Sequence, residues 1–132
     1  MKKYLDIVLK VVLTLLLLLP IVGLTGVMPA PTRDLYHTDK AFQFIQILMD
    51  GVYVNVMMGV AALLALYFMW TRRMALAMLL ILPITLNIAG FHAFLDGGPF
   101  TSGAVMGDLF LLINLYFVWQ CREQYRSLLN RV

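Results

Sequence analysis

The sequence is poor in cysteine, histidine and charged residues, and each shortage excludes a class of function. Its only cysteine, Cys121, cannot form a disulfide within the chain or a Cys-x-x-Cys redox pair. Two histidines and one cysteine are too few for a typical structural zinc site, so no metal is expected. Charged residues make up 13% of the chain, about half of their share in soluble domains. The net charge of +3 is small and scattered, which argues against a nucleic-acid partner.

Hydrophobic residues dominate instead and fall into four long segments. They make up 62% of the 132 residues, and each segment reaches the ~20 residues that a helix needs to cross a bilayer. We therefore predict an all-α protein, an integral membrane antiparallel four-helix bundle that forms a single transmembrane domain over 1–132, with the lipid bilayer around it. The first segment also resembles a signal peptide, but we expect it to be retained. The expected helices span about 5–27, 41–70, 74–95 and 104–121.

Lysine and arginine gather on one side of the expected bundle. The N-terminus, the connection between the second and third helices and the C-terminal tail carry eight of the ten, whereas the other connections carry only Arg33 and Lys40. Because positively charged loops stay in the cytoplasm, this pattern predicts a multi-pass protein of the bacterial inner membrane with both termini cytoplasmic. The eight are Lys2, Lys3, Lys10, Arg72, Arg73, Arg122, Arg126 and Arg131.

The stretch from Leu79 to Pro99 is a hydrophobic helix interrupted by polar and helix-breaking residues. Pro83 removes a backbone donor and predicts a kink. At about 100° per residue the unusual positions form two opposite stripes, and at least one should meet protein because polar groups are costly against lipid. We predict that Asn87 and Gly90 mark a tightly packed face. One stripe holds Pro83, Asn87, Gly90 and Phe94, and the other holds Thr85, His92 and Asp96.

Polar residues in the outer half of the expected bundle predict a small outward-facing pocket. Asp50 would cost about 2.5–3.5 kcal/mol in hydrocarbon, so it should face the bundle or a water-filled crevice, or be protonated. We hypothesise that Asp50 and His92 form a titratable pair, since a carboxylate beside an imidazole suits the proton transfers of quinone chemistry. The remaining ligand-binding candidates are Gln46, Asn87, Asp108 and Asn114.

Two alternatives stay open for these residues. The asparagines can simply fasten helices to each other, an interaction that contributes about 0.6 kcal/mol on average. His92 can instead turn toward Thr85 and Asp96, leaving Asp50 with Gln46 and water. Haem ligation by His37 and His92 is not expected, because His37 lies in a connection and nothing in the sequence fixes its distance from His92.

Three motifs add a resemblance. GVMPAP closes the first helix, DGVYVN lies in the second, and PITLNIAGFHAFLDG fills the third. Together they resemble the DoxX-like family of small four-helix membrane proteins, which takes its name from membrane subunits of a thiosulfate:quinone oxidoreductase. The resemblance implies an accessory or redox-associated subunit with a quinone or small-ligand pocket, and with a protein partner or as a homo-oligomer. The alternative is a small transporter or ligand-binding membrane protein that uses the same pocket. A self-sufficient enzyme is not expected, because the chain has no cofactor motif.

Overall fold

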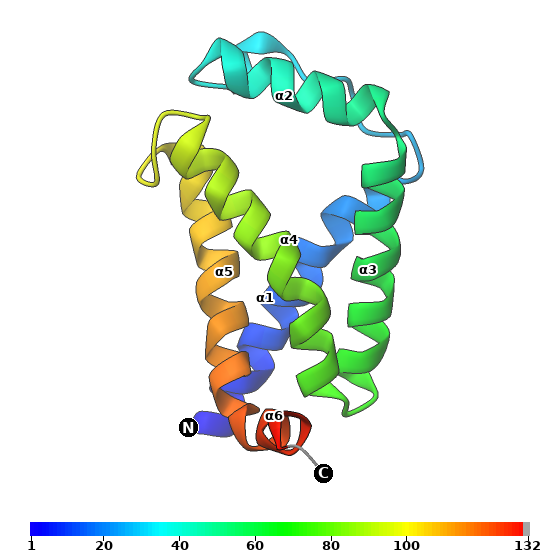
Figure 1. Cartoon of the computed structure of the whole chain (residues 1–132), viewed down its shortest axis with the longest axis vertical. Coiled ribbons are helices and arrows are strands. Elements are labelled where there is room, and N and C mark those ends of the chain that lie inside the picture. The colour runs from blue at the N-terminus through cyan, green and yellow to red at the C-terminus, as the bar shows by residue number, and fades with distance from the viewer. Residues whose placement is uncertain (131–132) are drawn as a thin grey trace.

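The computed structural model describes residues 1–130, and every regular element in that range is a helix (Figure 1). This confirms the predicted all-α class. The elements are α1 (Lys2–Gly23), the short 3₁₀ turn η1 (Arg33–Leu35), α2 (Asp39–Asp50), α3 (Tyr53–Trp70), α4 (Met74–Phe94), α5 (Ser102–Gln120) and α6 (Arg122–Leu129).

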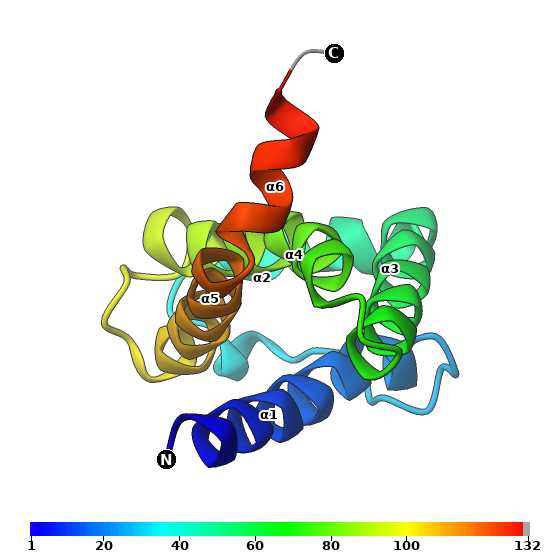
Figure 2. The same cartoon turned by 90° about the horizontal axis from the view of Figure 1, so that it is seen from below.

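Four of these helices, α1, α3, α4 and α5, are long and apolar enough to cross a membrane. They run in alternating directions and form a bundle in which α4 packs against both α3 and α5, while α1 packs mainly against α3 (Figures 1 and 2). Helix α2 lies across one end of the bundle, here named the α2 end. Met1 and α6 lie at the opposite end, here named the α6 end (Figure 1).

The single helix predicted over 41–70 is wrong, because the chain breaks at Gly51 and Val52. Val52 has a φ of +39°, a conformation that is rare for a β-branched residue, and it separates α2 from α3. The sequence changes character at the same point, from an amphipathic stretch to one that is apolar on all sides. Thr38 starts α2 as an N-cap, since its Oγ1 accepts a hydrogen bond from the Ala41 N–H at 3.1 Å.

The buried core occupies the middle of the bundle and its α6 end. Small residues let the helices approach, and alanines at positions 62, 65 and 77 are completely buried. Large side chains from α1, α4 and α5 fill the space between them. The principal ones are Leu13, Leu17, Met78, Ile81, Phe110 and Phe117.

Two polar side chains are buried in this core and join α4 to α5. The Thr85 hydroxyl donates to Asn114 Oδ1 at 3.0 Å, and Asn114 Nδ2 donates to the Met78 carbonyl at 3.2 Å. Both residues are completely buried. The prediction that at least one polar stripe of 79–99 meets protein is therefore confirmed, and it is the stripe of Thr85 and Asp96.

The tightly packed face predicted at Gly90 is wrong. A Cβ added at Gly90 would have no heavy atom within 4 Å, and Asn87 is exposed. The close approach is made by the opposite partner, α5, where a Cβ at Gly107 would lie 2.8 Å from Ile88 Cγ2. Gly103 and Gly107 are four residues apart, which is the spacing that lets two helices pack closely.

The C-terminal tail also differs from the expectation of an irregular basic segment. Residues 122–129 form α6, which leaves the bundle sideways rather than continuing α5 (Figure 2). Arg131, one of the eight residues used to predict orientation, lies outside the described residues.

Candidate functional site

A buried carboxylate organises the α2 end of the molecule. Asp96 follows α4 and is 1% exposed. Its Oδ1 accepts a hydrogen bond from the His37 backbone N–H at 2.7 Å, and its Oδ2 lies 3.1 Å from Nδ1 of His92. Nδ1 of His37 approaches the same Oδ2 at 3.6 Å, and the Thr38 hydroxyl donates to the Leu95 carbonyl. These contacts, here named the Asp96 latch, attach the start of α2 to the end of α4.

The hydrogen bonds to Asp96 outweigh its burial. Burial by itself raises the pKa of a carboxyl group, but the His37 N–H and the His92 imidazole stabilise the charged form, and the pKa of Asp96 is lowered overall. The latch therefore holds an ionised carboxylate at neutral pH, to which the Nδ1–H of His92 donates.

His92 connects this latch to the interior of the bundle. Its side chain is 16% exposed and packs against the first turns of α5, where a Cβ at Gly103 would lie 3.1 Å from His92 Cε1. Within residues 1–130 its other ring nitrogen, Nε2, has no protein hydrogen-bond partner and is not a fully buried unsatisfied atom. A histidine fixed at Nδ1 by a carboxylate keeps Nε2 available for a ligand or water.

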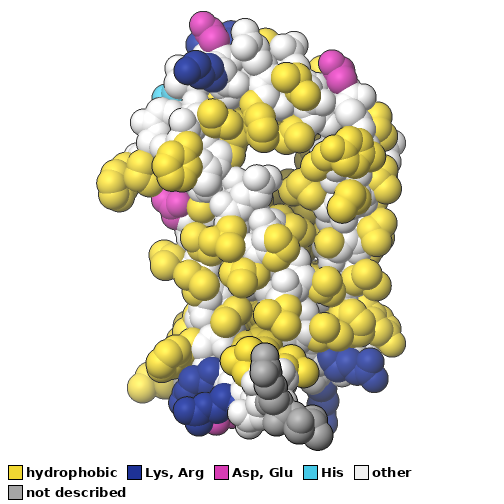
Figure 3. Space-filling view, viewed as in Figure 1, with side chains coloured by type: hydrophobic (Ala, Val, Ile, Leu, Met, Phe, Trp, Pro, Cys, Tyr) yellow, Lys and Arg dark blue, Asp and Glu magenta, His cyan; other side chains and the backbone are white. Residues whose placement is uncertain are grey.

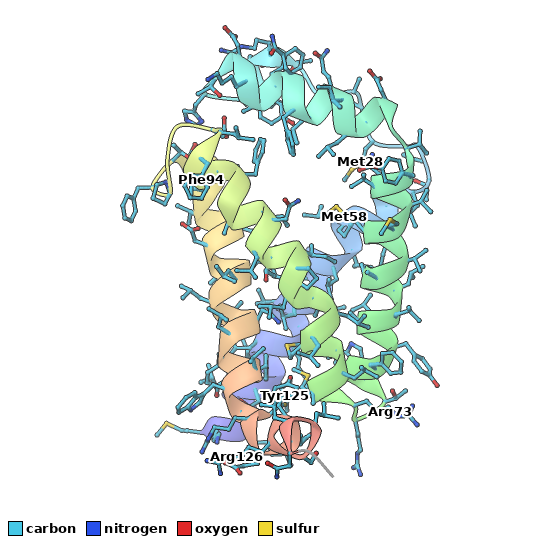
Figure 4. All side chains as sticks on the ribbon, viewed as in Figure 1. Met28, Met58, Arg73, Phe94, Tyr125 and Arg126 are labelled. Atoms are coloured by element: carbon cyan, nitrogen blue, oxygen red, sulfur yellow. The ribbon has the colours of Figure 1, made fainter. Side chains whose placement is uncertain are left out.

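A large apolar cavity lies between α2 and the bundle. Its volume is about 580 Å³, and it is lined by residues of α1, α3, α4 and α5. Met28 and Met58 border it below α2, where the surface of the molecule is hollowed (Figures 3 and 4). Leu19 of α1 and Met106 of α5 also line it and are more than half exposed, so the cavity reaches the side of the bundle between these two helices. Leu16, Pro20, Ile84 and Phe110 complete its principal apolar walls.

A second cavity of about 330 Å³ adjoins the first and lies directly against α2. Four residues line both cavities, namely Met49, Asn55, Met58 and Ile88. The second cavity has more polar groups, contributed by Tyr36, Asn55, Asn87 and His92. Its aromatic wall includes Phe44 of α2, whose ring stacks on that of Phe91 of α4 at 5.8 Å between centroids. The combined space suits an elongated molecule with a planar polar head and an apolar tail.

The structure does not bring the predicted pair of Asp50 and His92 together. Asp50 is the last residue of α2 and is exposed, as is Gln46, whereas His92 pairs with Asp96. Helix α2 lies across the bundle with Phe44, Ile45 and Leu48 against the cavity, so its polar stripe points away from it. Asp50 thus avoids burial without a partner or a proton. The alternative with His92 at Asp96 is the arrangement observed.

The other candidates divide in the same way. Asn87 lines the second cavity together with His92. Asn114 lies in the core with Thr85 and fastens two helices, as the structural alternative predicted for it. Asp108 is half-buried on α5 and lines neither cavity.

Sequence reasoning did not assign a site role to Asp96, Tyr36 or Asn55. The spacing of His92 and Asp96 at i and i+4 was a usable signal, because such residues are neighbours on a helix. Tyr36 and His37 lie about sixty residues earlier in a connection, where no periodicity indicates what they contact.

The chain matches no family model, and no curated protein or solved structure matches it. The DoxX-like resemblance therefore stays a prediction, and the functional argument depends on the cavity and the residues around it.

Proposed function

We propose that this chain is an integral membrane protein that binds a lipophilic small molecule of the quinone class beneath α2. The observation that supports this best is the apolar double cavity, whose polar groups gather at one end around His92. Its size falls in the range of about 300–1,000 Å³ that small-molecule sites occupy. A quinone has the matching shape, with a flat ring that carries hydrogen-bond acceptors and an isoprenoid tail.

The membrane setting explains the two contrasting surfaces. The bundle exposes large apolar side chains over most of its height, as lipid contact requires, and its charges lie at the two ends (Figure 3). Helix α2, with a polar outer face and an apolar inner face, then lies at the membrane surface and covers the cavity. The opening beside Leu19 and Met106 faces the acyl chains, so a lipophilic ligand reaches the cavity from the bilayer.

His92 gives this site its chemical capability. With Nδ1 hydrogen-bonded to Asp96, its Nε2 can donate a hydrogen bond to a quinone carbonyl or exchange a proton with it. No described residue set supplies electrons, so the chain would act as an accessory or redox-associated subunit with a protein partner or as a homo-oligomer. The alternative, a small transporter or ligand-binding membrane protein, would use the same cavity and opening.

Binding can be tested with a radiolabelled short-chain quinone and the protein in lipid nanodiscs. Gly23 lines the larger cavity with open space at its Cβ, so Gly23→Phe should fill it and weaken binding at least about tenfold. Gly90→Phe is the matched control, because Gly90 has equally open space but lines neither cavity. Binding no greater than that of empty nanodiscs, or equal loss in both variants, would contradict the proposal.

We further propose that the α6 end is cytoplasmic in a bacterial inner membrane, as the distribution of Lys and Arg predicts. In a Cys121→Ser background, cysteines introduced at the exposed positions Gln43 and Ser102 should react with an impermeant thiol reagent applied to intact cells. Cysteines at Thr71 and Ser127 should react only after the cells are opened. The reverse pattern would place the cavity on the cytoplasmic side.

A further inference from the structure

The α6 end carries an excess of positive charge that is not neutralised within the described chain. Its two acidic residues are already engaged, since Asp6 accepts hydrogen bonds from Tyr116 and Gln120 at 2.9 Å each, and Glu123 pairs with Arg126 at 3.0 Å. Against these stand seven described basic residues, which appear in Figure 3 around the foot of the bundle. They are Lys2, Lys3, Lys10, Arg72, Arg73, Arg122 and Arg126.

Helix α6 has two chemically distinct faces. At 100° per residue, Tyr125, Leu128 and Leu129 share one face, and Glu123 and Ser127 lie on the other. Leu128 and Leu129 are 74% and 80% exposed, although they are the most apolar residues of the helix. The apolar face of α6 is therefore largely unpartnered within the described chain.

The root of α6 has a fixed position on the bundle. The Tyr125 hydroxyl donates to the Ala75 carbonyl at 2.8 Å, which ties α6 to the start of α4 (Figure 4). Burial, with a smaller contribution from Cys121, raises the pKa of Tyr125 to about 12, so the phenol keeps the proton that it donates. From this point α6 projects sideways, across the axis of the bundle (Figure 2).

Two tryptophans mark the level at which α6 leaves the bundle. Trp70 lies beneath the Lys10 ammonium at 5.9 Å and Trp119 beneath the Arg122 guanidinium at 4.8 Å, and both rings are more than half exposed. Tryptophan beside a cation is typical of the headgroup region of a membrane. Because Arg122 is also the first residue of α6, the helix begins at headgroup depth.

We infer that α6 docks on anionic phospholipid, with Leu128 and Leu129 in the acyl boundary and Arg122 and Arg126 among the phosphates. An amphipathic helix with basic residues beside its apolar face binds a membrane surface in this orientation. Charge complementarity selects anionic headgroups, since each basic residue near such a surface adds to the attraction. The inference depends on the proposal that the bundle spans a membrane, and it adds a lipid preference.

Fluorescence quenching in nanodiscs tests it directly. In a Trp70→Phe, Trp119→Phe background, a single fluorophore is introduced as Leu128→Trp or, on the opposite face, as Ser127→Trp. We expect brominated acyl chains to quench Leu128→Trp at least about twice as strongly as Ser127→Trp, and aqueous iodide to show the reverse order. Phosphatidylglycerol should increase bromine quenching of Leu128→Trp over phosphatidylcholine alone, and adding Arg122→Gln and Arg126→Gln should abolish that increase.

Three outcomes would overturn the inference. They are equal iodide quenching at both positions, no effect of phosphatidylglycerol, and protection of Leu128→Trp from both quenchers, which would show that protein covers α6. Incorporation of the protein into nanodiscs, followed by size-exclusion chromatography, is a separate readout. Failure to incorporate would contradict the membrane proposal, whereas normal incorporation with a water-exposed Leu128→Trp would contradict only the role of α6.

Discussion

Gly107→Leu is expected to destabilise the bundle by about 1–3 kcal/mol, the usual cost of overpacking a core. Gly107 is buried at the point where α5 meets α4, and even a Cβ there would lie 2.8 Å from Ile88 Cγ2 and 3.5 Å from His92 Cδ2. A leucine side chain must therefore push the two helices apart. The measurement is equilibrium unfolding in mixed micelles, followed by loss of helical circular dichroism.

Gly90→Leu is the matched control for this substitution. Gly90 lies on α4 with no heavy atom near its Cβ position, so the change should alter stability by no more than about 0.5 kcal/mol. Equal losses at the two positions would show that α4 and α5 do not pack through the Gly103 and Gly107 face.

Asp96→Ala is expected to release α2 from the end of the bundle. The substitution removes the acceptor for the His37 N–H and the partner of His92 Nδ1 together. Hydrogen bonds to a charged group contribute about 1.5–3 kcal/mol, so amide exchange in α2 should become roughly 10- to 100-fold faster. Hydrogen exchange with mass spectrometry measures this for peptides that cover α2. The control is Asp50→Ala in the same helix, because Asp50 is exposed, and this change should leave the exchange rates within about twofold of wild type.

The same latch has a defined dependence on pH. The pKa of Asp96 is lower in the folded protein than the value of about 3.9 for an unfolded aspartate. The stability that its carboxylate contributes is therefore complete above that value and is lost as pH falls through the folded pKa. Corrected for the intrinsic pH effect, exchange in α2 should accelerate below pH about 4 in wild type but not in Asp96→Asn. Acceleration at the same pH in both would assign the effect to other groups.

Much of this fold follows from hydrophobic length alone. The boundaries of α1, α4 and α5 were predicted to within about four residues, because each is a long apolar run that ends at charge, glycine or proline. The break between α2 and α3 was missed although the residues signal it. Gln43, Gln46 and Asp50 make one stripe polar up to Gly51, and the stripe then stops, which is the pattern of a surface helix followed by a spanning one.

The site was less accessible to sequence reasoning. Depth in the expected bundle grouped Asp50 with His92, but depth does not say which way a helix lies, and α2 turned its polar face outward. The Asp96 latch joins the end of α4 to a connection some sixty residues earlier, a contact that only the folded chain brings together. The glycine pair on α5 was a readable signal, since small residues four apart indicate close helix packing, and it would have corrected the choice of Gly90.

The account's central claim is that a quinone-class ligand enters the cavity beneath α2 and meets Nε2 of His92. NMR of protein labelled at histidine, in nanodiscs with and without a short-chain quinone, tests it most directly. The account predicts a saturable shift of His92 Nε2, a much smaller change at His37, and loss of the His92 shift in Gly23→Phe but not in Gly90→Phe. A His92 resonance that does not respond to quinone, or that responds equally in Gly23→Phe, would contradict it.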